Sequence, residues 1–265
     1  MMQVRRNIGW SASVLLLCLV AVLLTPRLAF AAPPTPEPTE PLSLCAPGQN
    51  TFTADITNPY FPLPVGATWV YTGKEQGQNI GLEITVLDTE PFRFGGGQNV
   101  TTRVVRETEW ADTFANGVID PGEQLIEVSL NYFGQTQTGP APGTGTVCYF
   151  GENVDIYEDG EIVGHEGAWR ADGRKGLPGT APGIFMPAAP QPGMTFQQEV
   201  AEGVAQDLAT IVRTGTATLP DGTVVNTITV RDFNPLDGSR GTKVYAQGVG
   251  LIEDGPLRLL SVTGV

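Results

Sequence analysis

The sequence has few of the residues that carry common catalytic chemistry. It contains one histidine and three cysteines among 265 residues. It has no Gly-x-Ser-x-Gly nucleophile elbow, no His-Glu-x-x-His zinc motif and no Gly-x-x-x-x-Gly-Lys phosphate loop. A hydrolase triad and a structural zinc site therefore have little support, because a triad needs a histidine paired to its nucleophile and structural zinc needs four ligands.

Basic residues are also scarce. The chain has 15 lysines and arginines against 28 acids, a net charge of −13. Residues 1–31 hold three of the arginines and no acid, so without them the count is 12 against 28, a net charge of −16. This charge argues against binding to nucleic acid and to anionic membranes, which both need a basic face. It is compatible with a cationic ligand or with calcium.

The N-terminal segment has the pattern of a signal peptide. Arg5 and Arg6 precede an apolar run, Val14–Leu24, and Ala29 and Ala31 are small residues at a cleavage site. We predict a signal peptide over residues 1–31 and a secreted or periplasmic, cell-envelope location with no membrane span after cleavage. An uncleaved membrane anchor stays open, although the run is shorter than the roughly 20 apolar residues of a typical span.

Two cysteines, Cys45 and Cys148, follow this segment. In an oxidising compartment they predict one disulfide that closes a long loop. Residues 32–44 contain repeated prolines and predict a disordered tether. Residues 45–265 then form a single β domain.

Short runs rich in β-branched and aromatic residues dominate this domain. Two hairpin turns are expected, at residues 158–160 and 220–222. Residues 170–193 are rich in Gly and Pro and predict a long covering loop, and residues 196–212 fit a helix and a strand about equally. We predict a mostly β fold with a single curved antiparallel sheet and at most one or two short helices, the strands being expected at residues 68–72, 80–87, 100–109, 125–133, 147–150, 154–157, 161–163, 217–219 and 223–230.

Two segments resemble an uncharacterised secreted bacterial family. The opening reads Tyr-Phe-Pro-Leu-Pro-Val-Gly-Ala-Thr-Trp-Val-Tyr over residues 60–71, and the closing strand reads Tyr-Ala-Gln-Gly-Val-Gly over residues 245–250. Between them, residues 149–152, 166–169, 182–188 and 198–199 are similar to the same family. The resemblance implies a strongly curved half-barrel whose concave face holds something apolar. It implies no activity.

Residues 111–122 look like an insertion with the spacing of a calcium loop. Asp112, Asn116, Asp120 and Glu123 occupy positions 1, 5, 9 and 12 of such a loop. Position 3 is Phe114, which cannot coordinate a metal, and the flanking segments look like strands. Calcium is therefore a candidate cofactor, and a hairpin loop with solvated acids is the alternative.

The middle of the chain supplies a candidate ligand site. Apolar residues there alternate with polar ones, as in many small-molecule pockets. A core without any site is the alternative. The candidate ligand-binding residues are Tyr149, Glu152, Glu166, Trp169, Phe185, Met186, Gln198, Glu199 and Asp207.

Three functions follow from these patterns. The first is a non-catalytic secreted or envelope-associated protein that holds a small apolar or amphipathic ligand, or an envelope component, on a concave sheet face. The second is an acid/base enzyme, such as a carbohydrate-active hydrolase, that uses Glu152, Glu166 or Glu199. The third is a structural secreted domain with a calcium-stapled loop.

Overall fold

The fold is built from long antiparallel strands. The computed structural model describes residues 35–140 and 143–265, so the predicted signal peptide lies outside the described residues. Two short 3₁₀ helices, η1 (Leu42–Cys45) and η2 (Gly95–Gly97), are the helical elements of the described part. The mostly β prediction, with at most two short helices, is confirmed.

One sheet contains fifteen strands. A separate two-stranded ribbon consists of β2 (Thr57–Asn58) and β3 (Phe61–Pro62). The strands of the large sheet are β1 (Phe52–Thr53), β4 (Thr68–Glu75), β5 (Gln78–Arg93), β6 (Asn99–Ala111), β7 (Leu125–Thr136), β8 (Val147–Glu158), β9 (Glu161–Gly164), β10 (Trp169–Arg170), β11 (Gly183–Met186), β12 (Thr195–Gln197), β13 (Leu208–Thr218), β14 (Val224–Phe233), β15 (Arg240–Ala246), β16 (Gly250–Asp254) and β17 (Leu257–Thr263).

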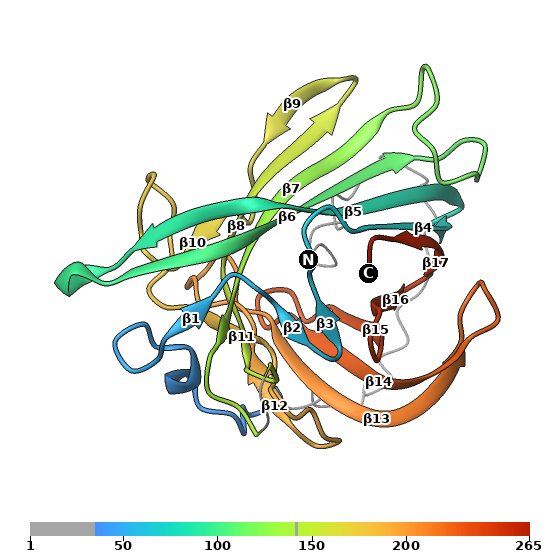
Figure 1. The fold of residues 1–265 in the computed structure, drawn as a ribbon. Coiled ribbons are helices and arrows are strands. Elements are labelled where there is room, and N and C mark those ends of the chain that lie inside the picture. Colours follow the sequence, from blue (N-terminus) through green and yellow to red (C-terminus); the bar gives the residue numbers. More distant parts are fainter. Residues whose placement is uncertain (1–34, 141–142) are drawn as a thin grey trace, which may run out of the picture.

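The strand order is β10-β8-β7-β6-β5-β4-β17-β16-β15-β14-β13-β12, with β1 beside β7 and with β9 and β11 beside β8. All of these pairs are antiparallel, as predicted. The path of paired strands is open, and the sheet is not strongly curled. The strongly curved half-barrel that the resemblance implied is therefore corrected to an open sheet, in which β4–β8 form one wing and β13–β16 the other (Figure 1).

Both predicted hairpin turns are present. Glu158 pairs with Glu161 across one turn, and Thr218 pairs with Val224 across the other. The ambiguous segment 196–212 forms strand at both ends, because β12 and β13 pair with each other. The closing segment bends at its glycines: Gly248 lies in the turn between β15 and β16 and Gly250 begins β16, with φ values of 80° and 97° that favour glycine.

The covering loop is anchored to the sheet. Its apolar segment forms β11, which pairs with β8 and whose four residues are all buried. The N–H of Thr180, in the same loop, donates to the carbonyl of Val200 beyond β12. The loop therefore links β8 in one wing to the segment after β12 in the other.

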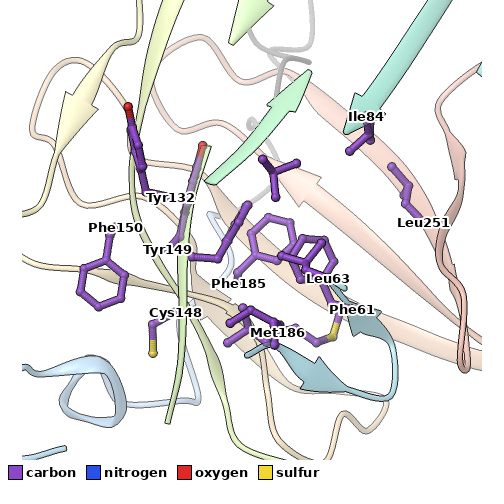
Figure 2. Packing of buried hydrophobic residues seen from close by; sticks show 14 of the residues in the cluster. Phe61, Leu63, Ile84, Tyr132, Cys148, Tyr149, Phe150, Phe185, Met186 and Leu251 are labelled. Atoms are coloured by element: carbon purple, nitrogen blue, oxygen red, sulfur yellow. The ribbon is translucent and has the colours of Figure 1, made fainter. Parts of the chain in front are cut away.

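The β2–β3 ribbon lies between the two wings and inserts Phe61 into the core (Figure 1). The ring of Phe61 lies 4.4 Å from that of Phe185 and 5.1 Å from that of Phe133. Figure 2 shows Phe61, Leu63, Phe185 and Met186 gathered in one group. Asn58 holds the ribbon in place, because its buried amide donates to the carbonyl of Pro187 at 3.0 Å. Aromatic packing of this kind adds to the free energy of burial.

The N-terminal part of the described chain also lies on the sheet. The N–H of Thr39 donates to the carbonyl of Thr195 at 2.7 Å, so the end of the predicted tether contacts β12. The predicted disulfide is confirmed: Cys45 and Cys148 are bonded, both fully buried, and 103 residues apart in sequence.

Loss of this disulfide is expected to weaken the fold strongly. Closing a loop of this length removes chain entropy from the unfolded state, so replacing both cysteines by serine should lower the free energy of unfolding by about 4 kcal/mol. Urea unfolding of the double variant measures the change, and the unmodified protein in a reductant is the control. A loss below about 1 kcal/mol would contradict the entropic account.

Candidate functional site

The candidate site lies on the face of the sheet that the β2–β3 ribbon covers, here called the inner face. Cross-strand partners share a face. Ile84 is opposite Trp69 on one side and Glu107 on the other. Ser129 continues the row on β7. Apolar and acidic side chains therefore stand on one face.

An apolar hollow occupies one part of the inner face. It measures about 230 Å³, including its open mouth, and its lining residues are Phe61, Pro62, Leu63, Trp69, Tyr71, Ile84, Gly250 and Leu251. The indole N–H of Trp69 donates to the carbonyl of Val249, and the hydroxyl of Tyr71 donates to that of Leu251, both at 2.8 Å. Because these polar atoms are already bonded, both rings offer apolar surface to the hollow.

A group of acids occupies another part, here called the carboxylate cluster. Four members are buried, and Glu107 and Asp254 are half-buried. The ammonium of Lys243 lies 2.6 Å from Asp232 Oδ2 and 4.0 Å from Asp254 Oδ1. The members of the cluster are Glu107, Glu152, Glu199, Asp207, Asp232 and Asp254.

One buried cation contacts the cluster. Three cations are buried in the described residues. Arg103 faces Asp55, and Arg170 pairs with Glu90 and Asp172 while its guanidinium stacks on a phenylalanine ring. Among these three, Lys243 is the cation that contacts the cluster, through Asp232 and Asp254.

A β-bulge brings Tyr149 and Glu152 to the same face. These residues are three apart, and strict alternation would place them on opposite faces. The register shifts beside Gly151, whose φ of 134° suits glycine. The Tyr149 hydroxyl then bonds Asn131 Oδ1 and lies 3.2 Å from Glu152 Oε2. It has one proton for these two acceptors.

The charges of these acids act on two buried tyrosines. Burial raises the pKa of Tyr149 well above its ordinary value, and the charges of Glu152 and Glu199 raise it further. Burial likewise raises the pKa of Tyr71, and the negative charges of Glu107 and Asp254 raise it further. Tyr71 also lines the hollow. The hollow and the carboxylate cluster therefore adjoin at Tyr71.

Asp207 has the most perturbed environment of the cluster. It is 7% exposed, and its Oδ1 has no hydrogen-bond partner in the part of the chain that the structure describes. Burial, and then the negative charge of Asp232, raise its pKa from 3.8 to about 7, against the opposing charge of Lys243. A carboxyl group of this kind is typical of functional sites.

The structure brings together only some of the predicted ligand-binding residues. Glu152, Glu199 and Asp207 join the cluster, with Tyr149 beside them. Gln198 is buried next to them, and its N–H donates to the carbonyl of Asp207. Trp169, Phe185 and Met186 are 0–1% exposed and pack in the core.

Glu166 does not join the cluster. It is exposed in the turn between β9 and β10. Of the three candidate catalytic acids, Glu152 and Glu199 are therefore the two that are buried, and the charges of both act on Tyr149.

Several residues of the cluster were missed from the sequence: Glu107, Asp232, Lys243 and Asp254. A signal existed for Asp232, because it follows Ile228 and Val230 at every second position and so shares their buried face. On β15, Lys243 is two positions before Tyr245, so the same alternation places both side chains on one face. No such signal existed for Asp254. It is three residues after Leu251, and the two share a face only because of a bulge in the pairing of β15 with β16.

The predicted calcium loop, between β6 and β7, is stabilised by hydrogen bonds among its own residues. Asp112 is fully buried, and its carboxylate accepts the backbone N–H groups of Asn116 and Gly117 at 3.1 and 2.9 Å. Glu123 accepts those of Thr113 and Asp120, while Asn116 donates to Asp120. Within residues 35–140 and 143–265, no group of three or more acids, histidines or cysteines has an arrangement that could hold a metal ion.

The chain matches no protein-family model, no curated protein and no solved structure. The family resemblance of the opening and closing segments therefore stays a prediction. Neither 3₁₀ helix, nor any other described part of the chain, supplies an apolar helix long enough to cross a membrane.

Removing the charge of Asp207 is expected to stabilise the protein at alkaline pH. Because its pKa is higher in the folded chain than in the unfolded chain, its ionisation destabilises the fold progressively from about pH 4 to pH 7. Asp207→Asn should raise the free energy of unfolding at pH 8 by about 2–4 kcal/mol and change it little at pH 4. Urea unfolding at both pH values tests this, with the exposed neighbour variant Glu202→Gln as control. A variant less stable at pH 8 would refute it.

The two interpretations of the loop 112–124 also predict different results. Asp112→Ala removes the acceptor of the Asn116 and Gly117 N–H groups, the second of which is buried, and should cost about 1–3 kcal/mol with or without calcium. If calcium binds, it should raise the melting temperature of the unmodified protein, and Asp120→Ala should abolish that rise. Thermal unfolding with calcium and with a chelator distinguishes the two cases.

Proposed function

We propose that this protein is a non-catalytic binding protein of an oxidising, extracytoplasmic compartment, where it holds a small amphipathic ligand against the inner face of its sheet. One observation carries the proposal. Tyr71 and Ile84 line the apolar hollow, and Ile84 is the cross-strand neighbour of Glu107, whose charge, with that of Asp254, raises the pKa of Tyr71. Apolar and ionisable surfaces thus adjoin, and a ligand with both characters can contact both.

The composition of the site supports binding. Ligand sites are mostly apolar, with a few polar groups that fix orientation. The hollow is small, because its volume of about 230 Å³ includes open solvent, so we expect it to take no more than a short apolar group of a ligand. The buried Cys45–Cys148 disulfide supports an oxidising compartment, because such bonds persist where thiols are not kept reduced.

An acid/base hydrolase is a second candidate, because Glu152 and Glu199 are both buried near Tyr149. Paired carboxyl groups in different environments can act as acid and base. This candidate requires turnover of aryl glycosides or esters that Glu152→Gln and Glu199→Gln each abolish. The binding function requires no turnover, and a ligand retained in native mass spectrometry would support it.

A neutral amphiphile should bind in the hollow. We expect 1-octanol to change the tryptophan fluorescence of the protein saturably, because Trp69 lines the hollow. Ile84→Phe should weaken this binding at least tenfold by filling the space, whereas Val224→Phe, which enlarges a 67% exposed side chain, should not. No saturable fluorescence change, or equal affinity in both variants, would exclude the hollow as the site.

A further inference from the structure

The outer edge of β13 has no partner strand over most of its length. β12 pairs with its first residues, Leu208–Thr210, and the N–H of Gly193 then donates to the carbonyl of Ile211. Beyond Ile211, no segment of residues 35–140 or 143–265 pairs with this side of β13, although the other side pairs with β14 as far as Thr218 (Figure 1). Such an edge presents backbone N–H and C=O groups to another chain.

The opposite end of the sheet is protected, because β11, β10 and β9 cover the outer side of β8 in turn. The open part of β13 has few of the devices that protect natural edges. It contains no proline and no acid, its one charge is Arg213, and its bulge is confined to residues 211–213. The side chains of residues 213–216 are exposed. This edge is therefore suited to strand pairing.

The backbone groups that point outward follow from the hairpin turn. The N–H of Leu219 donates to the carbonyl of Thr223, so the backbone groups of Leu219 point toward β14. In an antiparallel ladder this direction alternates along the strand. The N–H and C=O groups of Thr214, Thr216 and Thr218 therefore point away from β14, toward the open side.

Gly215 lies in the middle of this edge, and nothing within the described chain requires a glycine there. It is not among the glycines with positive φ. A Cβ at this position would meet one atom, Thr227 Oγ1 at 3.4 Å, which is an ordinary van der Waals contact. Glycine weakens the interior of a strand and often marks a place where another backbone approaches closely. The glycine is therefore a second observation that points to a partner at this edge.

We propose that the outer edge of β13 pairs antiparallel with the same edge of a second copy of this chain, about a two-fold axis at Gly215. A two-fold interface must be self-complementary, and this edge is. Thr214 lies opposite Thr216 of the partner subunit, and both point their backbone groups outward. Arg213 lies opposite Ala217 of the partner subunit, so the two arginines do not face each other. Because residues 208–218 contain no acid, the pairing adds no contact between like charges within the edge.

The oligomeric state tests the proposal. Pairing along one short edge buries little surface, so we expect a weak dimer that forms reversibly as the protein concentration rises. Sedimentation velocity up to millimolar protein measures it. Thr216→Pro should weaken the dimer at least tenfold, because proline removes an outward N–H that β14 does not use. Thr216→Ala keeps this N–H and should dimerise like the unmodified protein.

Two results of this experiment would overturn the proposal. One is an unmodified protein that stays monomeric at millimolar concentration, which would leave the edge to a strand of a different protein. The other is a dimer that Thr216→Pro leaves intact, which would place the interface elsewhere.

A pair of charge variants tests the register. Position 217 lies opposite Arg213 of the partner subunit, and opposite charges in such pairs are stabilising whereas like charges are destabilising. Ala217→Glu should therefore tighten the dimer about twofold or more at low salt, and Ala217→Arg should weaken it by a similar factor. Equal dimerisation of the two variants would overturn the pairing about Gly215.

A cross-link covers the case in which Thr216→Pro does not fold. Residues that face each other at the two-fold axis have Cα atoms about 4.5–5.5 Å apart, within reach of a disulfide. Gly215→Cys should therefore form a covalent dimer on oxidation, measured on a non-reducing gel. Val224→Cys, at a 67% exposed position of β14, should not. No cross-link in Gly215→Cys, or equal cross-linking of both variants, would overturn the proposal.

Discussion

The contact between the opening and closing segments is the constraint on which the rest of the structure depends. Trp69 and Tyr71 of β4 donate hydrogen bonds to the carbonyls of Val249 and Leu251, about 180 residues away. The backbone of β4 also pairs with β17, which pairs with β16. This junction joins the two wings into one sheet, and it forms the wall of the apolar hollow.

The junction also explains how acids from distant strands meet. Once the wings are joined and the covering loop links β8 to the segment after β12, Glu152 and Asp207 act on each other electrostatically. Bulges then turn individual side chains inward, as at Gly151. The outcome is a face that is apolar near the ribbon and acidic beyond Tyr71.

Much of the fold could be predicted from local patterns. β-Branched and aromatic runs marked the long strands, and the Asp-Gly turns marked two hairpins, because both signals act over a few residues. The open shape of the sheet could not be predicted, since it depends on the register of distant strands and on the ribbon between the wings. The bend at the closing glycines could be predicted from their spacing, but not that the carbonyl of Val249 in this turn accepts the bond from Trp69.

The sequence by itself determined the acidic charge, the antiparallel strands and the pairing of Cys45 with Cys148, because composition and short-range pattern are enough for these. Only the tertiary structure decided which acids form a site. It placed Asp232 and Asp254 beside Lys243, it buried Glu152, Glu199 and Asp207, and it left Glu166 exposed. The physical reason is that a buried charge is defined by its neighbours in space, and here those neighbours come from strands that are distant along the chain.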